Sequence, residues 1–388
     1  MSNRVVGLNP RVLLWAREQA GMSLEEVGQK MARTPASIAA WEEGSDAPTY
    51  VQLEKLAYQV YKRPLGLFFF PEPPSEEDLS HSFRTVPDFE LEDLRPDTRF
   101  KIREARSFQL SLHDLTDGVN PSPRKIFRDI RVNSHPSQQI AAEARRYLSI
   151  SFQTQAETWR SSRDALRGWR SALESSGVFV FKDAFEQADV SGFCLYDQEF
   201  PIILVNNSTP PTRQIFTICH ELAHILSATT GMTKLNDRYI ETLTGEAHRI
   251  EIFCNRLAAD LLVPQADLRR LVARQQVTDD LVADVASVFK VSREVVLRRL
   301  LDEGRVTKSY YEAKSAQWTS EAIQARAQQT AGGDYYKTQA AYLGDAYLRL
   351  AFQRYYRGSL SIEELADHLN VRPTSIPGLE QQLLSRPH

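Results

Sequence analysis

The most informative stretches of the sequence are residues 213–226, RQIFTICHELAHIL, and residues 250–264, IEIFCNRLAADLLVP. The first stretch has apolar residues at helical spacing and contains an H-E-x-x-H pattern between His220 and His224. This spacing places both imidazoles on one face of a helix, about one turn apart, where both can donate nitrogen to a single Zn²⁺ ion. The pattern therefore predicts that these two histidines are zinc ligands.

Glu221, which directly follows His220, is the predicted catalytic base. Its carboxylate can reach a metal-bound water without binding the ion. Zinc lowers the pKa of such a water to about 7, so that the carboxylate can remove a proton and leave a nucleophile. The structural alternative is a pair of histidines on a half-buried helix face without a metal, and it agrees less well with a helix that follows a sheet.

A catalytic zinc needs a third protein ligand, which the first helix cannot supply in a usable geometry. The next predicted helix offers Glu251 and His248, three residues apart beside its apolar stripe, and spacing alone puts Glu251 barely ahead. A surface acid paired with Arg249 or Asn255 is the commoner fate of such a residue. Weaker candidates for the third ligand are Glu246, Glu241 and Asp237.

A change of pattern at residue 177 indicates a small sheet. The segments GVFVFKDAF, SGFCLYD and FPIILVN, within residues 177–206, are short and rich in β-branched and aromatic residues, with polar turns between them. They predict three strands. Helical spacing follows over residues 212–229 and ends at Gly231, and a second helix is expected over about 245–263.

The first part of the chain predicts four short helices within residues 10–62. Ser23 is a favourable N-cap, and Glu26 completes a capping box. Thr34 can cap the next helix, with Pro35 at its first position.

The whole pattern predicts a mostly helical α+β protein with four segments. These are an N-terminal helix-turn-helix bundle (1–74), a helical connector (75–176), a compact domain with a small sheet (177–270) and a helical C-terminal extension (271–388). Two parts of the extension, 281–301 and 360–383, share the paired-helix outline of the first segment, although such pairs also serve simply to pack an α domain.

Composition excludes several classes of protein. The 388 residues include 47 Lys and Arg against 50 Asp and Glu, which gives a formal charge of -3 and excludes a globally basic surface for nucleic acid. No apolar run approaches the ~20 residues of a membrane span, and the start resembles no signal peptide, so we expect a cytoplasmic protein without a membrane partner. The three cysteines are far apart, which points to nitrogen and oxygen ligands for any metal.

The two stretches that carry the histidines and Glu251 resemble the ImmA/IrrE family of zinc metallopeptidases, which have small gluzincin-like domains. In that family the third zinc ligand is the Glu of E-x-x-x-N-x-x-A, which matches Glu251 here, with Asn255 and Ala258 in register. The sequence has Ala223 where the family usually has Gly, and Leu257 where Phe is common. The resemblance implies a zinc-dependent endopeptidase that cleaves a cognate repressor or other partner protein in a stress or prophage response.

The first segment resembles the Xre/Cro-like DNA-binding domain, in which the helix starting near Pro35 would enter the major groove. This resemblance implies operator DNA as a partner and a homodimer that matches a palindromic site. Base readout is expected from Thr34 and Ser37, and phosphate contacts from Lys30 and Arg33. Nearby acids oppose DNA, so a module for dimerisation or for holding a protein is the alternative.

A second function, from another class, is also open. Chains that pair an Xre-like domain with this type of peptidase domain resemble predicted antitoxins. Such a protein would bind and neutralise a partner toxin and repress its own operon, without any need for proteolysis.

Overall fold

The computed structural model describes residues 4–75, 83, 91, 94–132, 135–234, 237–273, 275–327 and 334–385, apart from the side chains of 237–239 and 322–327. Their contacts divide into two compact units. The first comprises the described residues within 1–82, 86–104 and 185–187, and the second comprises those within 83–85, 105–184 and 188–388.

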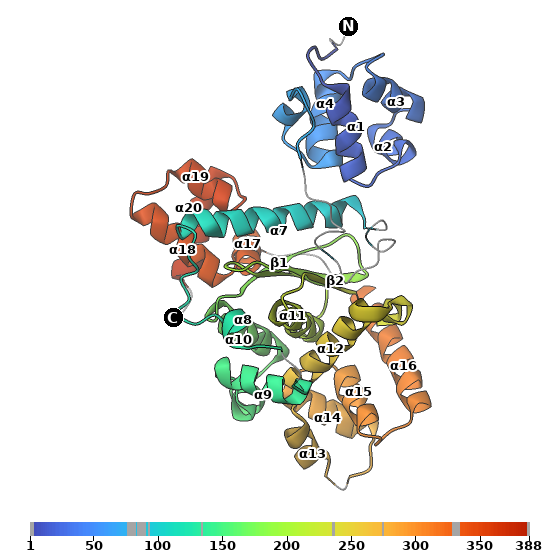
Figure 1. The fold of residues 1–388 in the computed structure, drawn as a ribbon, viewed down its shortest axis with the longest axis vertical. Helices are drawn as coiled ribbons and strands as arrows, with labels where there is room; N and C mark the ends of the chain where they lie inside the picture. Colours follow the sequence, from blue (N-terminus) through green and yellow to red (C-terminus); the bar gives the residue numbers. More distant parts are fainter. Residues whose placement is uncertain are drawn as a thin grey trace. The chain divides into compact units, whose positions relative to one another are not determined.

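The first unit is a bundle of short helices around its own apolar core (Figure 1). Its elements are α1 (Pro10–Gln19), α2 (Leu24–Met31), α3 (Pro35–Glu43), α4 (Tyr50–Lys55), the π-helical turn η1 (Leu56–Tyr61) and the 3₁₀ turn η2 (Leu65–Phe69). Leu13, Val27 and Trp41 are among the side chains that fill the core. The start of α7 (Pro96–Leu115) also belongs to this unit.

Local sequence signals set the helix ends of the first unit. The Ser23 side chain accepts a hydrogen bond from the Glu26 amide, and the Glu26 carboxylate accepts one from the Ser23 amide, so the predicted capping box is present. The Thr34 side chain caps α3, and Gly44 ends that helix in the left-handed conformation. The predicted run of four short helices is confirmed.

A four-stranded mixed sheet organises the second unit. Its strands are β1 (Phe179–Asp183), β2 (Val190–Leu195), β3 (Ile202–Asn206) and β4 (Gly231–Lys234), in the spatial order β1-β3-β2-β4. β1 and β3 are parallel, whereas β2 is antiparallel to both β3 and β4. The first three strands confirm the sequence prediction.

β4 was missed by the sequence prediction, which placed the end of a helix at Gly231. The helix α11 (Pro211–Leu226) ends earlier, and Gly231 instead begins a strand that pairs with β2. The strand is only four residues long, and its pairing partner lies more than thirty residues away along the chain. A strand of this kind is determined by tertiary pairing, which local periodicity does not reveal.

Helices cover both faces of the sheet (Figure 1). On one face, Val180 and Ile203 pack into a core shared with α10 (Ser162–Glu174) and α11. On the other face, Phe181 stacks on Phe108 of α7, with ring centroids 4.4 Å apart, and meets Tyr347 of α18 (Asp345–Tyr356) edge-on. The sheet is therefore the middle layer of this unit, which explains why its central strands are apolar on both faces.

A second layer of helices packs beyond α11 and extends the same core. α12 (Gly245–Leu262) contacts both α11 and α9 (Ser137–Tyr147). The remaining elements of this unit are α8 (Ile126–Asp129), η3 (Thr154–Thr158), η4 (Asp237–Thr242), α13 (Gln265–Val272), α14 (Asp279–Phe289), α15 (Arg293–Asp302), α16 (Lys308–Ala327), α17 (Tyr335–Leu343), α19 (Ile362–His368), η5 (Pro373–Ser375) and α20 (Ile376–Leu384). One continuous core joins side chains from Ile126 to Trp318.

The described part of the chain is thus a mostly helical α+β protein, as expected. None of the helices in that part is both long enough and apolar enough to span a lipid bilayer.

Candidate metal centre

Two packed helices bring the predicted metal ligands together. α11 carries His220 and His224, α12 carries Glu251, and all three residues are at most 1% exposed. α11 is buried around most of its circumference. Its apolar residues, such as Ile218 and Leu222, belong to the core of the second unit. A buried set of two imidazoles and a carboxylate is costly unless these groups satisfy one another or bind a cation.

The three ligand atoms have the separations expected around one small cation. His220 Nε2 lies 3.1 Å from His224 Nε2 and 3.4 Å from Glu251 Oε2, while His224 Nε2 lies 3.3 Å from Glu251 Oε1. Ligands about 2.0–2.1 Å from a tetrahedral zinc are about 3.3 Å from one another. Among the described residues, these three form the group of His, Cys, Asp or Glu side chains that could hold a metal ion. The donor set and its spacing fit zinc.

Hydrogen bonds to the outer ring nitrogens set which nitrogen of each imidazole faces the centre. Asn255 Oδ1 lies 2.9 Å from His220 Nδ1 and can only accept, so Nδ1 carries the proton. The Thr229 hydroxyl donates to the His224 carbonyl oxygen at 3.1 Å and therefore accepts from His224 Nδ1, also at 3.1 Å. Both Nε2 lone pairs are thereby directed to the shared centre, as metal ligation requires.

Glu251 and the two histidines also shift one another's pKa values. Burial opposes the charged form of each group, but the mutual attraction and hydrogen bonding are stronger. They raise the pKa of His220 and His224 and hold the pKa of Glu251 far below its usual range. The site therefore favours a carboxylate that balances positive charge, whether protons or a metal ion carry that charge.

Glu221 is fully buried on α11, one residue after the first candidate ligand. The Thr233 hydroxyl of β4 donates a short hydrogen bond to its Oε1 atom. Its other oxygen, Oε2, is buried without a conventional hydrogen-bond donor in the described part of the chain, and the Cys194 thiol interacts with the same carboxylate. A carboxylate that is held at one oxygen and open at the other is suited to exchange a proton with a water or substrate atom.

The other sequence candidates for a third ligand lie outside this cluster. Glu241 and Glu246 are exposed, and His248 is half-buried on α12 but is not part of the three-residue group. The side chain of Asp237 falls outside the described residues. Glu251 is not the surface acid of the alternative interpretation, because it has no exposed area.

The three cysteines are buried and unpaired, which agrees with the absence of a disulfide pattern in the sequence. Burial raises the pKa of the Cys219 thiol, so this residue has the character of an apolar core residue and not of a reactive thiolate.

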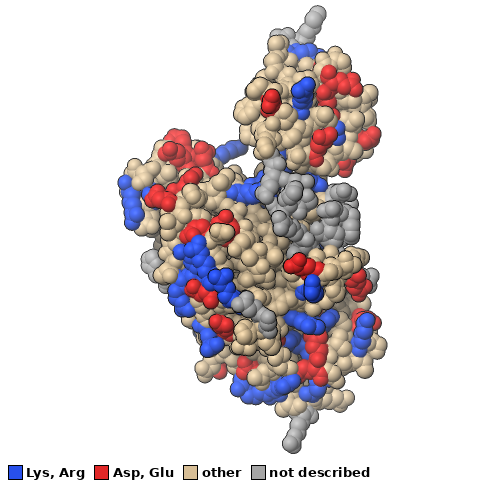
Figure 2. Space-filling model, viewed as in Figure 1, with Lys and Arg blue, Asp and Glu red and all other residues tan. Residues whose placement is uncertain are grey.

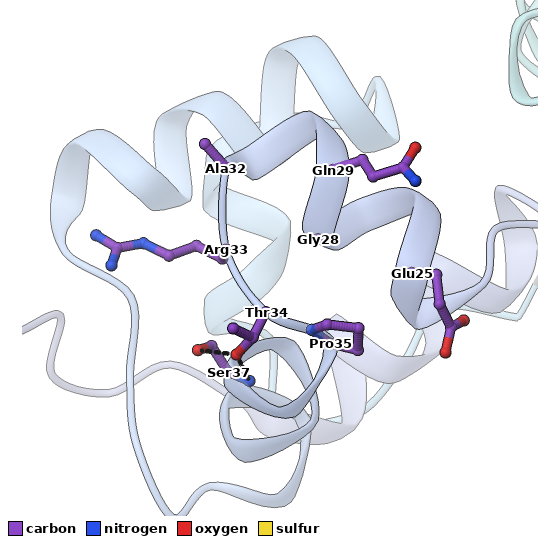
Figure 3. A pocket seen from close by; sticks show the side chains of 8 residues that line it. All are labelled: Glu25, Gly28, Gln29, Ala32, Arg33, Thr34, Pro35 and Ser37. Atoms are coloured by element: carbon purple, nitrogen blue, oxygen red, sulfur yellow. Dashed lines mark hydrogen bonds between the residues drawn. The ribbon is translucent and has the colours of Figure 1, made fainter.

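The predicted DNA-contact residues lie around a hollow between α2 and α3 (Figure 3). Arg33, Thr34 and Ser37 line it, and Lys30 is exposed nearby on α2. The hydroxyls of Thr34 and Ser37 are 2.9 Å apart and hydrogen-bonded, so each is partly engaged within the helix cap. Glu25 lines the same hollow and weakens its positive potential.

Surface charge is mixed on the face shown in Figure 2, where basic and acidic side chains are interspersed over the second unit. This agrees with the nearly balanced composition and leaves local contacts as the route to any nucleic-acid binding.

Comparison with known proteins identifies the class of the domain that carries the candidate metal centre. Residues 173–301 match the family model of the IrrE N-terminal-like domain, peptidase family M78. The matched range contains both α11 and α12.

The chain is also similar to two curated proteins. The chain is 29% identical over 117 residues to the radiation response metalloprotease IrrE of Deinococcus radiodurans, which is 30% of this chain and 35% of that protein. It is 33% identical over 109 residues to the radiation response metalloprotease IrrE of Deinococcus deserti, which is 28% of this chain and 38% of that protein. The chain thus spans little more than a third of the length of the curated relatives it matches.

Proposed function

We propose that this chain is a zinc-dependent endopeptidase that acts as a regulator in the cytoplasm. One observation carries the proposal: Nε2 of His220, Nε2 of His224 and the Glu251 carboxylate converge at tetrahedral spacing. The similarity of residues 173–301 to a peptidase family supports the same function.

Zinc, when bound, supplies Lewis-acid activation of water and of the scissile carbonyl group. The chain's own residues then account for orientation and proton transfer. Glu221 takes the proton of the attacking water at Oε2 and later delivers it to the leaving amine nitrogen. Thr233 holds Oε1, which keeps the reactive oxygen of Glu221 in place during both transfers.

The proposed partner is a cognate repressor or another protein, and the first unit would bring the enzyme to operator DNA, with the active form a homodimer. The two short helices α2 and α3, joined by a tight turn, have the outline of an Xre-like helix-turn-helix. Arg33 and Lys30, exposed beside that turn, are the proposed phosphate contacts, and Thr34 and Ser37 are the proposed base contacts. The name of the two Deinococcus relatives supports a role in a stress response.

The test is the Glu221→Gln variant of the full chain, with Glu246→Gln as a control on an exposed acid. Each purified protein is incubated with Zn²⁺ and with proteins encoded beside its gene, and the mixture is analysed by mass spectrometry. We expect one zinc per chain in all three proteins, and cleavage of one partner by the unmodified chain and by Glu246→Gln only.

Absence of zinc from the unmodified chain would overturn the proposal. Full neutralisation of a neighbouring toxin by Glu221→Gln, without cleavage, would favour an antitoxin that binds its partner.

A further inference from the structure

Gly231, the first residue of β4, lies directly against the His224 imidazole. A Cβ atom at residue 231 would lie 2.3 Å from Cδ2, 2.4 Å from Cγ and 2.6 Å from Nε2 of His224. Contacts below 3.0 Å essentially never occur for real Cβ atoms, so any side chain at this residue would displace the ring or the strand.

Other contacts hold both the ring and the strand in place. His224 is fully buried, and its Nδ1 atom is hydrogen-bonded to the Thr229 hydroxyl. The backbone of Gly231 is paired with Cys194 of β2, and its amide donates to the Cys194 sulfur at 3.3 Å. The observed position of the His224 ring therefore requires glycine at residue 231.

Thr229 fixes the remaining freedom of the ring. Its hydroxyl contacts both the carbonyl oxygen and Nδ1 of His224, which defines the rotation of the imidazole about its side-chain bonds. The Thr229 hydroxyl thus holds the His224 ring at Nδ1, and the backbone of Gly231 packs against the ring. Thr229 lies in the short segment that joins α11 to β4, and Gly231 is the first residue of that strand.

We propose that Gly231 and Thr229 are positioning residues that hold the His224 ring with Nε2 toward Glu251 and thereby set the affinity of the site for zinc. The inference rests on the proposed zinc centre and deepens it, because it makes the α11–β4 connection part of that centre. Groups that orient metal ligands change metal affinity by about 10–100-fold when they are removed.

The experiment measures zinc affinity of the full chain by competition with a chromogenic chelator. Gly231→Ala is compared with Gly66→Ala, because a Cβ at Gly66 meets no atom within 4 Å. Thr229→Val is compared with Thr116→Val, whose hydroxyl donates to a helix carbonyl oxygen away from the site. Thr229→Ser, which keeps the hydroxyl, serves as a rescue variant.

We expect Gly231→Ala and Thr229→Val to bind zinc about 10–100-fold more weakly than the unmodified chain. Both controls and Thr229→Ser should bind within about two-fold of it, since they leave the ligand geometry intact. The visible absorption of the Co²⁺-loaded protein should also change in the two test variants, because the bands report ligand geometry. Loss of the fold would abolish these bands, because the three ligands come from two packed helices, and it is therefore distinguishable from a shift of the bands.

Equal zinc affinity of folded Thr229→Val and the unmodified chain would overturn the inference, even if Gly231→Ala failed to fold. An unmodified chain that binds no zinc would instead overturn the metal centre, so the two failures are distinguishable.

Discussion

Asn255 Oδ1 lies 2.9 Å from His220 Nδ1, so the helix that supplies the candidate ligand Glu251 also orients the imidazole of a ligand on the neighbouring helix. Asn255 and Glu251 are one helical turn apart on α12, and both therefore face α11. The packing of the two helices fixes the candidate ligand set and its orientation together.

Replacing Asn255 with Leu should weaken zinc binding by about 10–100-fold, because Nδ1 of His220 loses the acceptor that sets its tautomer and ring angle. Asn255→Asp keeps an oxygen at the same place and should retain most of the affinity. Chelator competition measures both. Unchanged affinity in Asn255→Leu would show that the hydrogen bond does not orient the ligand.

Replacing Asp260 with Ala should lower the free energy of unfolding by about 3–5 kcal/mol, because it leaves a buried guanidinium without its partner. Asp260 on α12 lies 2.8 Å from Arg299 on α15, and both side chains are less than 10% exposed. Urea denaturation of the full chain measures the effect. Asp302→Ala, which removes the exposed partner of Arg298, should change stability by less than about 1 kcal/mol.

The double variant Asp260→Leu with Arg299→Met removes both charges of this buried ion pair. Apolar residues of similar size should restore most of the lost stability, since no unpaired charge remains buried. A double variant as unstable as Asp260→Ala alone would contradict this account.

Replacing Lys182 with Met should make the free energy of unfolding less dependent on pH between about pH 8 and pH 10.5. Burial, together with the charges of Arg170 and Arg163, lowers the pKa of Lys182 from 10.5 to about 8. The unfolded chain therefore binds more protons than the folded chain between these two values, and stability due to this group rises as pH increases from about 8 to about 10.5.

We expect Lys182→Met to be more stable than the unmodified chain by up to about 3 kcal/mol at pH 7, with the difference shrinking toward pH 10. Thermal unfolding as a function of pH measures it, and Lys308→Met, at a side chain 81% exposed, is the control. A difference that is constant with pH would contradict the shifted pKa.

Replacing Arg33 or Lys30 with Ala should weaken DNA binding and lower the slope of log affinity against log salt by about 1 for each phosphate that the variant no longer neutralises. The probe is a 30-bp duplex, about three helical turns, selected by the full chain from a random library. Arg167→Ala, at an exposed arginine of α10, is the matched control. An unchanged slope in both variants would contradict the proposed phosphate contacts of Lys30 and Arg33.

The sequence was sufficient for features that depend on neighbouring residues. The capping box at Ser23 and the cap at Thr34 are complete within four residues, and both are present in the structure. The pairing of His220 with His224 follows from helix periodicity alone, and their Nε2 atoms are 3.1 Å apart.

Features that depend on helix packing or strand pairing could not be predicted from neighbouring residues in the sequence. Spacing left Glu251 and His248 almost equal, because both are near the same stripe of one helix, and the family motif favoured Glu251. Thr229, Gly231 and Thr233, which hold the candidate ligand His224 and the proposed base Glu221, were missed as site residues. They lie on a turn and a four-residue strand, where no periodic signal marks them.

The continuous core of the second unit, from Ile126 to Trp318, has a consequence for inheritance as well as for stability. Helices on both sides of the family match share this core, so a recombination event that copied only the H-E-x-x-H region would transfer a fragment with uncovered apolar surfaces. A transferred segment that carries the candidate metal centre would therefore need the helices that cover this core in order to keep its apolar surfaces buried.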